Sequence, residues 1–162
     1  MSLAHDEFVS LYGGIYEHSP WVAEYTHEAA AEVEDVEELA EIFANCVDQA
    51  GDERKLALIR AHPDLAGKAA TSGELTEESS AEQASAGIDQ CSPEEYQRFQ
   101  DLNSQYKKKF GFPFVMAVRD SNRHEILAAF ESRLENDKET EFETAIGEIH
   151  KIARMRLQAL NT

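Results

Sequence analysis

Apolar residues in this chain recur at steps of three and four positions along almost the whole sequence, and this spacing constrains the fold more than any other feature. The clearest stripe consists of Val36, Leu39, Ala40, Phe43 and Val47. Because an α-helix has about 3.6 residues per turn, residues at this spacing share one helix face. We predict a helix over residues 35–50 that ends at Gly51, and an all-α, single-domain helical bundle as the fold class.

Turn and capping signals divide the rest of the sequence into further helices. We predict them near residues 8–12, around 21–31, from 56 to 62, from 76 to 87, from 93 to 110, from 122 to 134 and from 136 to 160. With the helix over 35–50, the bundle is expected to have about eight helical segments.

The sharpest helix start lies at Ser92, where Pro93 and Glu95 follow at the first and third helical positions. A serine and a glutamate at this spacing form a capping box, and proline costs nothing at the first position because its missing N–H would be unpaired there. Asn122 is predicted to cap the next helix, and the tetrapeptide beginning at Asn136 is predicted to be a second capping box.

Residues 111–118 are the only stretch with a β-like composition. The stretch is apolar, but Pro113 interrupts it, and the sequence contains no second β-like stretch that could pair with it. An isolated strand does not build a sheet, so we expect a short, extended and buried segment here.

The length of 162 residues predicts one domain over residues 1–162. Acidic residues number 32 against 15 basic ones, and the resulting formal charge of −17 disfavours binding to nucleic acid or to anionic lipid. No apolar run is long enough to span a bilayer, and the acidic N-terminal residues do not resemble a signal peptide. We expect a cytoplasmic protein without nucleic-acid or membrane partners.

The first candidate functional residue is His62, which Pro63 follows directly. Proline disfavours helical geometry in the residue before it, so His62 is predicted to lie at a helix end. A histidine with an ordinary pKa of about 6.5 suits proton transfer near neutral pH. The alternative is a helix-terminal histidine that only hydrogen-bonds a carbonyl.

The second candidate is one helix face, formed by Ser79, Glu82, Gln83 and Ala86. Residues at these spacings lie on the same side of a helix. A carboxylate beside an amide and a hydroxyl can orient a histidine and can hydrogen-bond a ureido or imide group, which offers N–H donors and C=O acceptors together. The alternative is a solvated polar face.

The third candidate is Arg156, which falls within the apolar stripe of the last predicted helix, seven positions after Ile149. An arginine on a buried face needs an anion. That anion is either Glu82 or another carboxylate of the chain, or the carboxylate of a ligand. We expect the ligand, so that replacing Arg156 with methionine leaves the protein stable and nearly inactive.

No motif in the sequence predicts a metal or another cofactor. The six histidines show no HExxH or similar spacing, and Cys46 and Cys91 stand in no metal-binding, disulfide or nucleophile pattern. A glycine loop for phosphate binding is also missing from the sequence.

Several ordered motifs together resemble one known family. They are His62-Pro63-Asp64-Leu65-Ala66-Gly67, Leu75-Thr76, Ser79-x-x-Glu82-Gln83, Ala86-Gly87, Phe99-x-x-Leu102-Asn103-x-x-Tyr106, Lys109-Phe110-Gly111-Phe112-Pro113-Phe114, Arg119 and Glu148-Ile149-x-x-Ile152-Ala153-x-x-Arg156-Leu157. With these motifs, which run from about residue 56 to residue 160, the chain resembles 2-oxo-4-hydroxy-4-carboxy-5-ureidoimidazoline (OHCU) decarboxylases.

The resemblance implies an all-helical, homodimeric enzyme of urate breakdown that needs no cofactor and converts OHCU to (S)-allantoin and carbon dioxide. It implies that His62 is the catalytic histidine, Glu82 its acidic partner and Arg156 the anion-binding arginine. The substrate contacts that it implies are Pro63, Ser79, Gln83 and the backbone of Phe114, Val115, Met116, Ala117 and Val118. Two other functions remain open from the residues alone: a non-catalytic helical binding module, and an enzyme of the same scaffold that acts on a related ureido or hydantoin acid.

Overall fold

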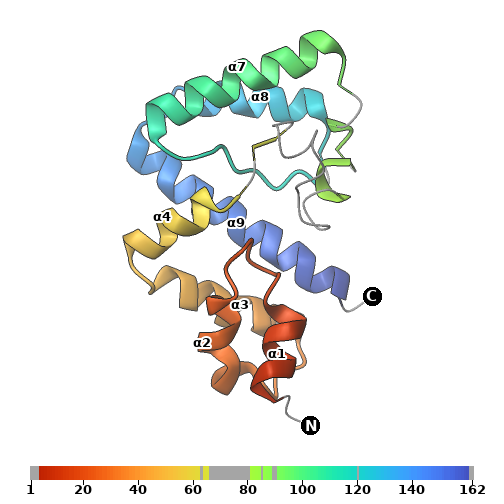
Figure 1. Ribbon diagram of the computed structural model, residues 1–162, viewed down its shortest axis with the longest axis vertical. Helices are drawn as coiled ribbons and strands as arrows, with labels where there is room; N and C mark the ends of the chain where they lie inside the picture. The colour runs from red at the N-terminus through yellow and green to blue at the C-terminus, as the bar shows by residue number, and fades with distance from the viewer. Residues whose placement is uncertain are drawn as a thin grey trace. The chain divides into compact units, whose positions relative to one another are not determined.

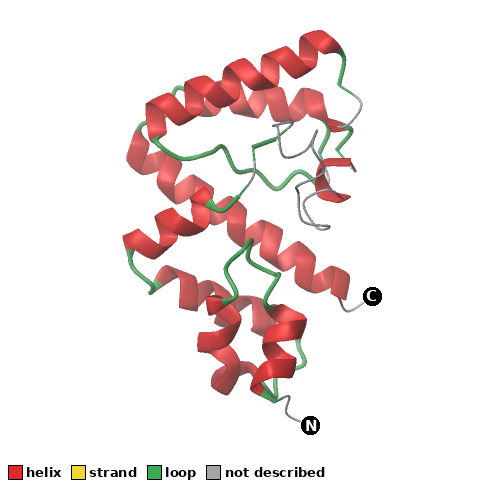
Figure 2. Cartoon of the chain, viewed as in Figure 1, coloured by secondary structure: helices red, strands yellow, loops and turns green. Residues whose placement is uncertain are grey.

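The computed structural model describes residues 4–62, 64–65, 81–84, 86–88, 91–119 and 121–160. Within these ranges the chain is all-α and has no strand, as predicted (Figure 2). The helices are α1 (His5–Tyr12), α2 (Trp21–Ala30), α3 (Val36–Asp48), α4 (Asp52–Arg60), α7 (Pro93–Phe110), α8 (Arg123–Arg133) and α9 (Lys138–Leu160) (Figure 1). Residues 81–84 are also helical.

The chain divides into two compact units. Residues 1–61 and 149–162 make up the first, here named the terminal unit, and residues 62–148 make up the second, here named the central unit. Helix α9 contributes its first part to the central unit and its last part to the terminal unit.

Helices α1, α2 and α3 build the core of the terminal unit around Phe8 and Phe43. Both side chains are almost completely buried, and their rings meet edge to face with centroids 6.2 Å apart. Asp35 begins α3 by accepting the backbone N–H of Glu38 at 3.1 Å, which satisfies one of the unpaired donors at the helix start. The prediction that Gly51 ends this helix was wrong in detail: α3 ends at Asp48, and Gly51, with φ of +92°, is the N-cap of α4.

Within the terminal unit, His150 of α9 links the buried residue Tyr16 to the end of α3. The Tyr16 hydroxyl lies 2.8 Å from Nδ1 of His150, and Nε2 of that histidine lies 3.0 Å from a carboxylate oxygen of Asp48. Burial, reinforced by the negative charge of Asp48, raises the pKa of Tyr16 well above its usual value. The tyrosine therefore stays neutral and serves as a hydrogen-bonding anchor.

The predicted capping box at the start of α7 is confirmed. The Glu95 N–H donates to the Ser92 hydroxyl at 3.2 Å, and the Ser92 N–H donates to the Glu95 carboxylate at 2.9 Å. Asn122 caps α8 as predicted, because its side-chain oxygen accepts two backbone N–H groups. The cap of α9 is one residue later than predicted, since Asp137 rather than Asn136 accepts the N–H of Thr140, at 2.7 Å.

Aromatic side chains from three segments form the core of the central unit. Tyr106 and Phe110 come from α7, Phe112 and Phe114 from the segment that follows it, and Phe130 from α8. All five are buried, and the rings of Phe114 and Phe130 stack with centroids 3.9 Å apart. Residues 113–118 are neither helix nor strand and run from the end of α7 back toward the start of α8, as expected for an extended, buried segment (Figure 1).

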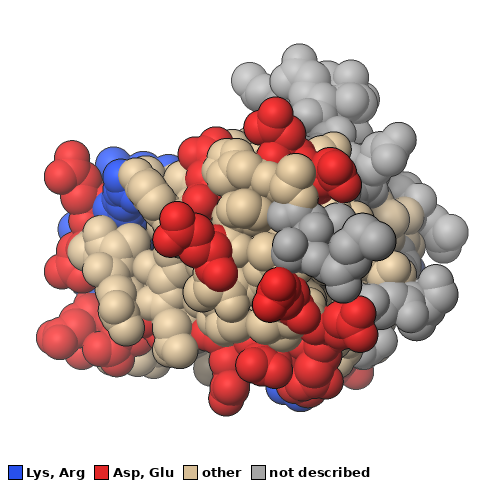
Figure 3. All heavy atoms as spheres, turned by 90° about the horizontal axis from the view of Figure 1, so that it is seen from below, with Lys and Arg blue, Asp and Glu red and all other residues tan. Residues whose placement is uncertain are grey.

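Acidic side chains are more widespread than basic ones on the visible surface (Figure 3). On the face drawn in Figure 3 they are widely spread, whereas lysine and arginine are visible at few places. No helix in the described part of the chain is long and apolar enough to cross a membrane.

Candidate active site

The structure places most of the predicted site residues in the central unit. This unit contains His62, Glu82, Gln83 and residues 114–118, whereas Arg156 belongs to the terminal unit. Pro63 and Ser79 lie outside the described residues.

His62 is buried, with 8% of its surface exposed. It follows the end of α4 at Arg60, which agrees with the prediction that the helix stops at the histidine. A buried histidine beside a helix end has few accessible rotamers, so its ring is held in place by its surroundings.

Helix α7 holds the backbone just after His62. The Asn103 side-chain amide donates to the Leu65 carbonyl at 3.0 Å, and Lys107, one helical turn further, donates to the Asp64 carboxylate at 2.5 Å. Asn103 is 5% exposed, and its own side-chain oxygen is buried without a hydrogen-bond partner among the described residues. These two contacts fix the chain two and three positions beyond the histidine.

The predicted polar face around Glu82 is not a solvated one. Gln83 and Ala86 are buried, at 5% and 2% exposure, and Glu82 is half-buried, whereas the neighbouring residues 81 and 84 are exposed. A carboxylate and an amide therefore lie on the inward side of this short helix, as a site that recognises a polar ligand requires.

The turn after this helix lies close to Arg123, the first residue of α8. Gly87 has a φ of +77°, and a Cβ atom at this position would lie 3.2 Å from a guanidinium nitrogen of Arg123. The same guanidinium binds the capping residue Glu95, with Nε 2.9 Å from a carboxylate oxygen. Hydrogen bonds from the Ser92 backbone and from Arg123 lower the pKa of Glu95, so it stays ionised.

The extended segment is held by two charged side chains to which the sequence assigned no role, although one of them, Glu148, stands in a family motif. Arg133 of α8 donates to the carbonyl of Val115 at 2.7 Å, and Glu148 of α9 accepts the N–H of Ala117 at 3.2 Å. The guanidinium of Arg133 also lies over the ring of Phe114, 4.3 Å from its centroid.

Arg133 is neutralised by a buried carboxylate, Glu141, which is fully enclosed. Glu141 accepts hydrogen bonds from Arg133 at 2.8 Å, from the Tyr106 hydroxyl at 2.5 Å and from the Asn136 side chain at 2.9 Å. Burial and the bond to Glu141 raise the pKa of Tyr106 far above its usual value. A sequence signal for this cluster did exist, because Glu141 shares a helix face with the buried residues Ala145 and Ile149.

Arg156 binds a carboxylate of the terminal unit. Its Nη2 donates to Oε2 of Glu17 at 2.9 Å, and its Nη1 donates to the carbonyl of Gly14 at 3.2 Å. Arg156 and Glu17 are both buried, at 6% and 2% exposure. Of the alternatives open from the sequence, the structure thus supplies a carboxylate of the chain itself, and that carboxylate is Glu17.

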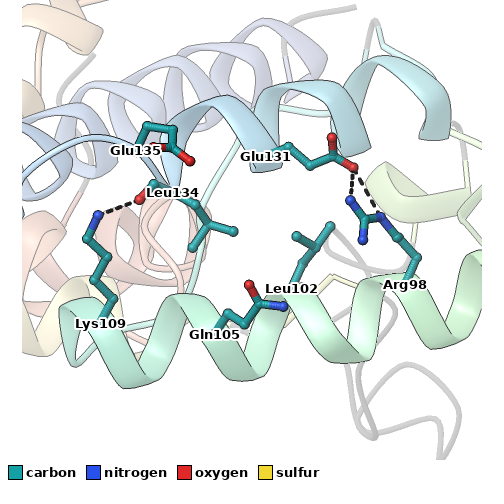
Figure 4. A pocket seen from close by; sticks show the side chains of 7 residues that line it. All are labelled: Arg98, Leu102, Gln105, Lys109, Glu131, Leu134 and Glu135. Atoms are coloured by element: carbon teal, nitrogen blue, oxygen red, sulfur yellow. Dashed lines mark hydrogen bonds and ion pairs between the residues drawn. The ribbon is translucent and has the colours of Figure 1, made fainter.

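A polar groove of about 470 Å³ lies between α7 and α8 of the central unit (Figure 4). It is lined by Arg98, Leu102, Gln105, Lys109, Glu131, Leu134 and Glu135. Arg98 is bound to Glu131 at one end of the groove, and Lys109 to the Leu134 carbonyl at the other. None of the predicted site residues lines it.

No group of three or more histidine, cysteine, aspartate or glutamate side chains that could hold a metal ion occurs in the described ranges.

Comparison with known proteins decides the family. The family model described as OHCU decarboxylase matches residues 1–158, which is almost the entire sequence. The chain belongs to the OHCU decarboxylase family.

Individual members of the OHCU decarboxylase family and related proteins agree with this assignment. A 2-oxo-4-hydroxy-4-carboxy-5-ureidoimidazoline decarboxylase from Haloferax volcanii is 47% identical over 155 residues, which cover 96% of this chain and 89% of that protein. A uric acid degradation bifunctional protein from a Bacillus species is 39% identical, with 98% of this chain covered and 30% of that protein. The crystal structure of (S)-allantoin synthase is 36% identical and superposes with a TM-score of 0.76, over 98% of this chain and 51% of that one.

Proposed function

We propose that this protein is an OHCU decarboxylase of urate breakdown, which converts OHCU to (S)-allantoin and carbon dioxide without a cofactor. The observation that carries the proposal is the 47% identity to a decarboxylase of that name over nearly the full length of both chains. The product is supported by the 36% identity and common fold with (S)-allantoin synthase.

The chemistry explains how a cofactor can be dispensed with. OHCU bears its carboxylate on the same ring carbon as a hydroxyl group, next to the ureido-bearing carbon of a ring C=N bond. When the bond to the carboxylate breaks, carbon dioxide leaves, the electron pair forms a double bond between these two carbons, and the former C=N nitrogen takes up the displaced pair with a proton, which leaves an enol. The substrate thus supplies its own electron sink, which otherwise is the task of a cofactor. The protein has to bind the anion and deliver one proton to one face of the ureido-bearing carbon, while the enol loses its hydroxyl proton and becomes the second ring carbonyl of (S)-allantoin.

We assign the roles in this reaction as the family motifs imply. His62 transfers a proton, Glu82 orients it and supports its charged form, and Arg156 binds a carboxylate or the developing oxyanion. The burial of His62 and of the face around Glu82 supports these roles, because a site shielded from water strengthens each electrostatic contact. The hydrogen bond from Arg156 to Glu17 fixes the orientation of the guanidinium, and a fixed guanidinium suits the proposed binding of an anion.

We also propose substrate contacts and an assembly. Pro63, Ser79, Gln83 and the backbone of residues 114–118 contact the substrate, since an extended backbone leaves N–H and C=O groups for a flat, polar heterocycle. The protein acts as a homodimer in the cytoplasm, as the resemblance implies for the assembly and the sequence predicts for the compartment.

The proposal is tested with freshly generated OHCU, following the optical activity of the product by circular dichroism. We expect the wild type to form (S)-allantoin much faster than the spontaneous reaction, which yields a product of lower optical purity. His62→Gln should abolish the acceleration while the helix content stays unchanged. His124→Gln is the matched control, because the His124 side chain is 72% exposed.

Three outcomes of this assay would contradict the proposal. A His62→Gln enzyme within tenfold of the wild-type rate would remove His62 from catalysis. Loss of wild-type activity in EDTA, restored by a divalent ion, would overturn the metal-free reaction. A wild type without any acceleration would refute the decarboxylase function and favour a binding module or a related ureido substrate.

A further inference from the structure

The extended segment over residues 113–118 has a backbone pattern that singles out one residue. In an extended chain the N–H and C=O of one residue point to the same side, and those of the next residue point to the opposite side. Val115 and Ala117 therefore direct their backbone polar groups to one side, and Phe114 and Met116 direct theirs to the other.

The structure shows what occupies the first of these two sides. The carbonyl of Val115 accepts from Arg133 at 2.7 Å, and the N–H of Ala117 donates to Glu148 at 3.2 Å. The two contacts are two residues apart, as the alternation requires for groups on one side. Side chains from α8 and α9 thus bind this side of the segment.

On the opposite side of the segment, one residue that is not fully buried, Met116, has a backbone N–H and C=O that can bind a ligand. Phe114 is 1% exposed and buried in the aromatic core, whereas Met116 is half-buried. The N–H and C=O of Met116 form no hydrogen bond with any described residue. Half-buried backbone groups are normally paired with protein, water or a ligand, so this pair is suited to a ligand.

We propose that Arg133 and Glu148 are positioning residues, which turn the N–H and C=O of Met116 toward the substrate as a donor–acceptor pair for its ureide group. A ureide offers one N–H and one C=O side by side, which complement the C=O and N–H of a single extended residue. This inference rests on the proposed decarboxylase function and narrows the backbone contacts of residues 114–118 to Met116.

The surroundings of Arg133 suit this role better than a role in stability alone. An ion pair with one fully buried member costs desolvation that a well-packed apolar pair avoids, so the pair of Arg133 with Glu141 is a poor choice for stability. Arg133 nevertheless binds Glu141, lies over Phe114 and still donates to the Val115 carbonyl. A guanidinium fork can reach several acceptors in a fixed plane, and the single ammonium group of lysine cannot.

The first test compares Arg133→Lys with the matched control Arg98→Lys, in which an exposed arginine of the same unit loses its fork. Arg133→Lys keeps a positive charge beside Glu141 but loses the hydrogen bond to the Val115 carbonyl. We expect KM for OHCU to rise on the order of tenfold, with kcat changed less than threefold and the pH profile of kcat unmoved. Arg98→Lys should leave both constants unchanged.

A purely structural role of Arg133 would give a different result. It would lower the folded fraction, and hence the apparent kcat, while KM of the remaining folded enzyme stayed at the wild-type value. That outcome would overturn the inference, and so would an unchanged KM in a fully folded variant. A second pair of variants tests the other contact: Glu148→Gln keeps an acceptor for the Ala117 N–H and should retain more affinity than Glu148→Met.

Amide hydrogen exchange tests Met116 directly, with (S)-allantoin as the probe. The Met116 amide should exchange slowly only when (S)-allantoin is added, whereas the Ala117 amide should be protected with and without it. New protection at Ala117 instead of Met116 would refute the proposed geometry. A wild type that is inactive toward OHCU refutes the proposed function itself and this inference with it. If the wild type is active, but Arg133→Lys leaves KM unchanged and the Met116 amide gains no protection, the inference alone is refuted.

Discussion

Arg156 and Glu17 form a buried ion pair between residues at opposite ends of the sequence. The nitrogen Nη2 lies 2.9 Å from Oε2, and the two side chains are 5% and 1% exposed. Arg156 also donates to the carbonyl of Gly14, so one guanidinium fixes the chain that follows α1. A substitution at position 156 therefore acts on the fold of the terminal unit as well as on any bound anion.

We expect Arg156→Met to destabilise the protein by about 3 to 5 kcal/mol, because it leaves the Glu17 carboxylate buried without its partner. This result differs from the expectation from sequence alone, which was a stable and nearly inactive variant. Urea unfolding followed by circular dichroism measures the change. An unchanged unfolding midpoint would show that the Glu17 charge is satisfied without Arg156.

The double variant Glu17→Gln/Arg156→Met serves as the control. This variant has no buried, unpaired charge at position 17, so we expect it to regain at least half of the stability that Arg156→Met loses. If Arg156 binds the substrate as proposed, the double variant stays nearly inactive although it is folded. Recovery of activity together with stability would assign Arg156 a structural role only.

Gly87 and Gly147 offer a matched pair of glycine-to-alanine substitutions. Gly87→Ala should cost about 1 to 2 kcal/mol, because φ is +77° and the new Cβ would lie 3.2 Å from Arg123. Gly147 lies within α9 and has open space around its Cβ position, so Gly147→Ala should stabilise the protein by about 0.5 to 1 kcal/mol. Thermal unfolding distinguishes the two, and a neutral Gly87→Ala variant would contradict the strain expected from the positive φ and the close approach of Arg123.

The pH dependence of stability should include a contribution from Glu95. Its pKa in the folded protein is lowered from 4.5, so the stability it contributes is complete above pH 4.5 and is lost as the pH falls through the folded value. We expect Glu95→Gln to be less stable than the wild type at pH 7 and the difference to vanish in acid. Glu131→Gln, which breaks an exposed ion pair, should have little effect at any pH. A difference between Glu95→Gln and wild type that persists below the folded pKa would contradict this account.

Salt should stabilise this protein. At a formal charge of −17, repulsion among surface carboxylates favours the unfolded chain. Screening shortens the Debye length from about 10 Å at 0.1 M to about 3 Å at 1 M salt, so the melting temperature should rise over this range of sodium chloride. A steady fall would instead mean that exposed pairs such as Arg154 with Glu37 contribute more than the repulsion.

Local signals in the sequence predicted local structure well. The capping box of Ser92 and Glu95 depends on residues three positions apart, and it is present as predicted. The end of α4 before His62 followed from the restriction that Pro63 places on its neighbour. The cap of α9 was placed one residue too early, because Asn136 and Asp137 are both good caps and only the structure shows which one accepts the N–H of Thr140.

Contacts between distant residues were not predictable in the same way. The sequence placed Arg156 on a buried face and required an anion, but it could not name Glu17, which is 139 positions away. The bonds from Arg133 and Glu148 to the extended segment were likewise missed, because they depend on how three segments pack. Glu141 was also missed, although its place on the apolar face of α9 is a signal that periodicity alone provides.

The side chain of Asn103 holds the backbone next to the proposed catalytic histidine. The amide nitrogen donates to the Leu65 carbonyl at 3.0 Å, and the whole side chain is 5% exposed. Asn103→Asp keeps the shape but replaces the donor with a carboxylate oxygen, so at neutral pH two acceptors would face each other in a buried place. We expect a loss of about 2 to 4 kcal/mol at pH 7, together with a fall in kcat as the segment after His62 shifts.

The pH dependence of the same variant distinguishes this cause from a general loss of packing. Burial raises the pKa of the new carboxyl group in the folded state, so the variant loses stability relative to the wild type as the pH rises from the unfolded pKa through the folded pKa. Below that value the carboxyl is protonated and can donate to the Leu65 carbonyl, and much of the loss should be recovered. Asn45→Asp, at an exposed position of α3, is the control and should show no such recovery. A loss that is equal at pH 4 and pH 7 would mean that Asn103 contributes shape rather than its donor hydrogen bond.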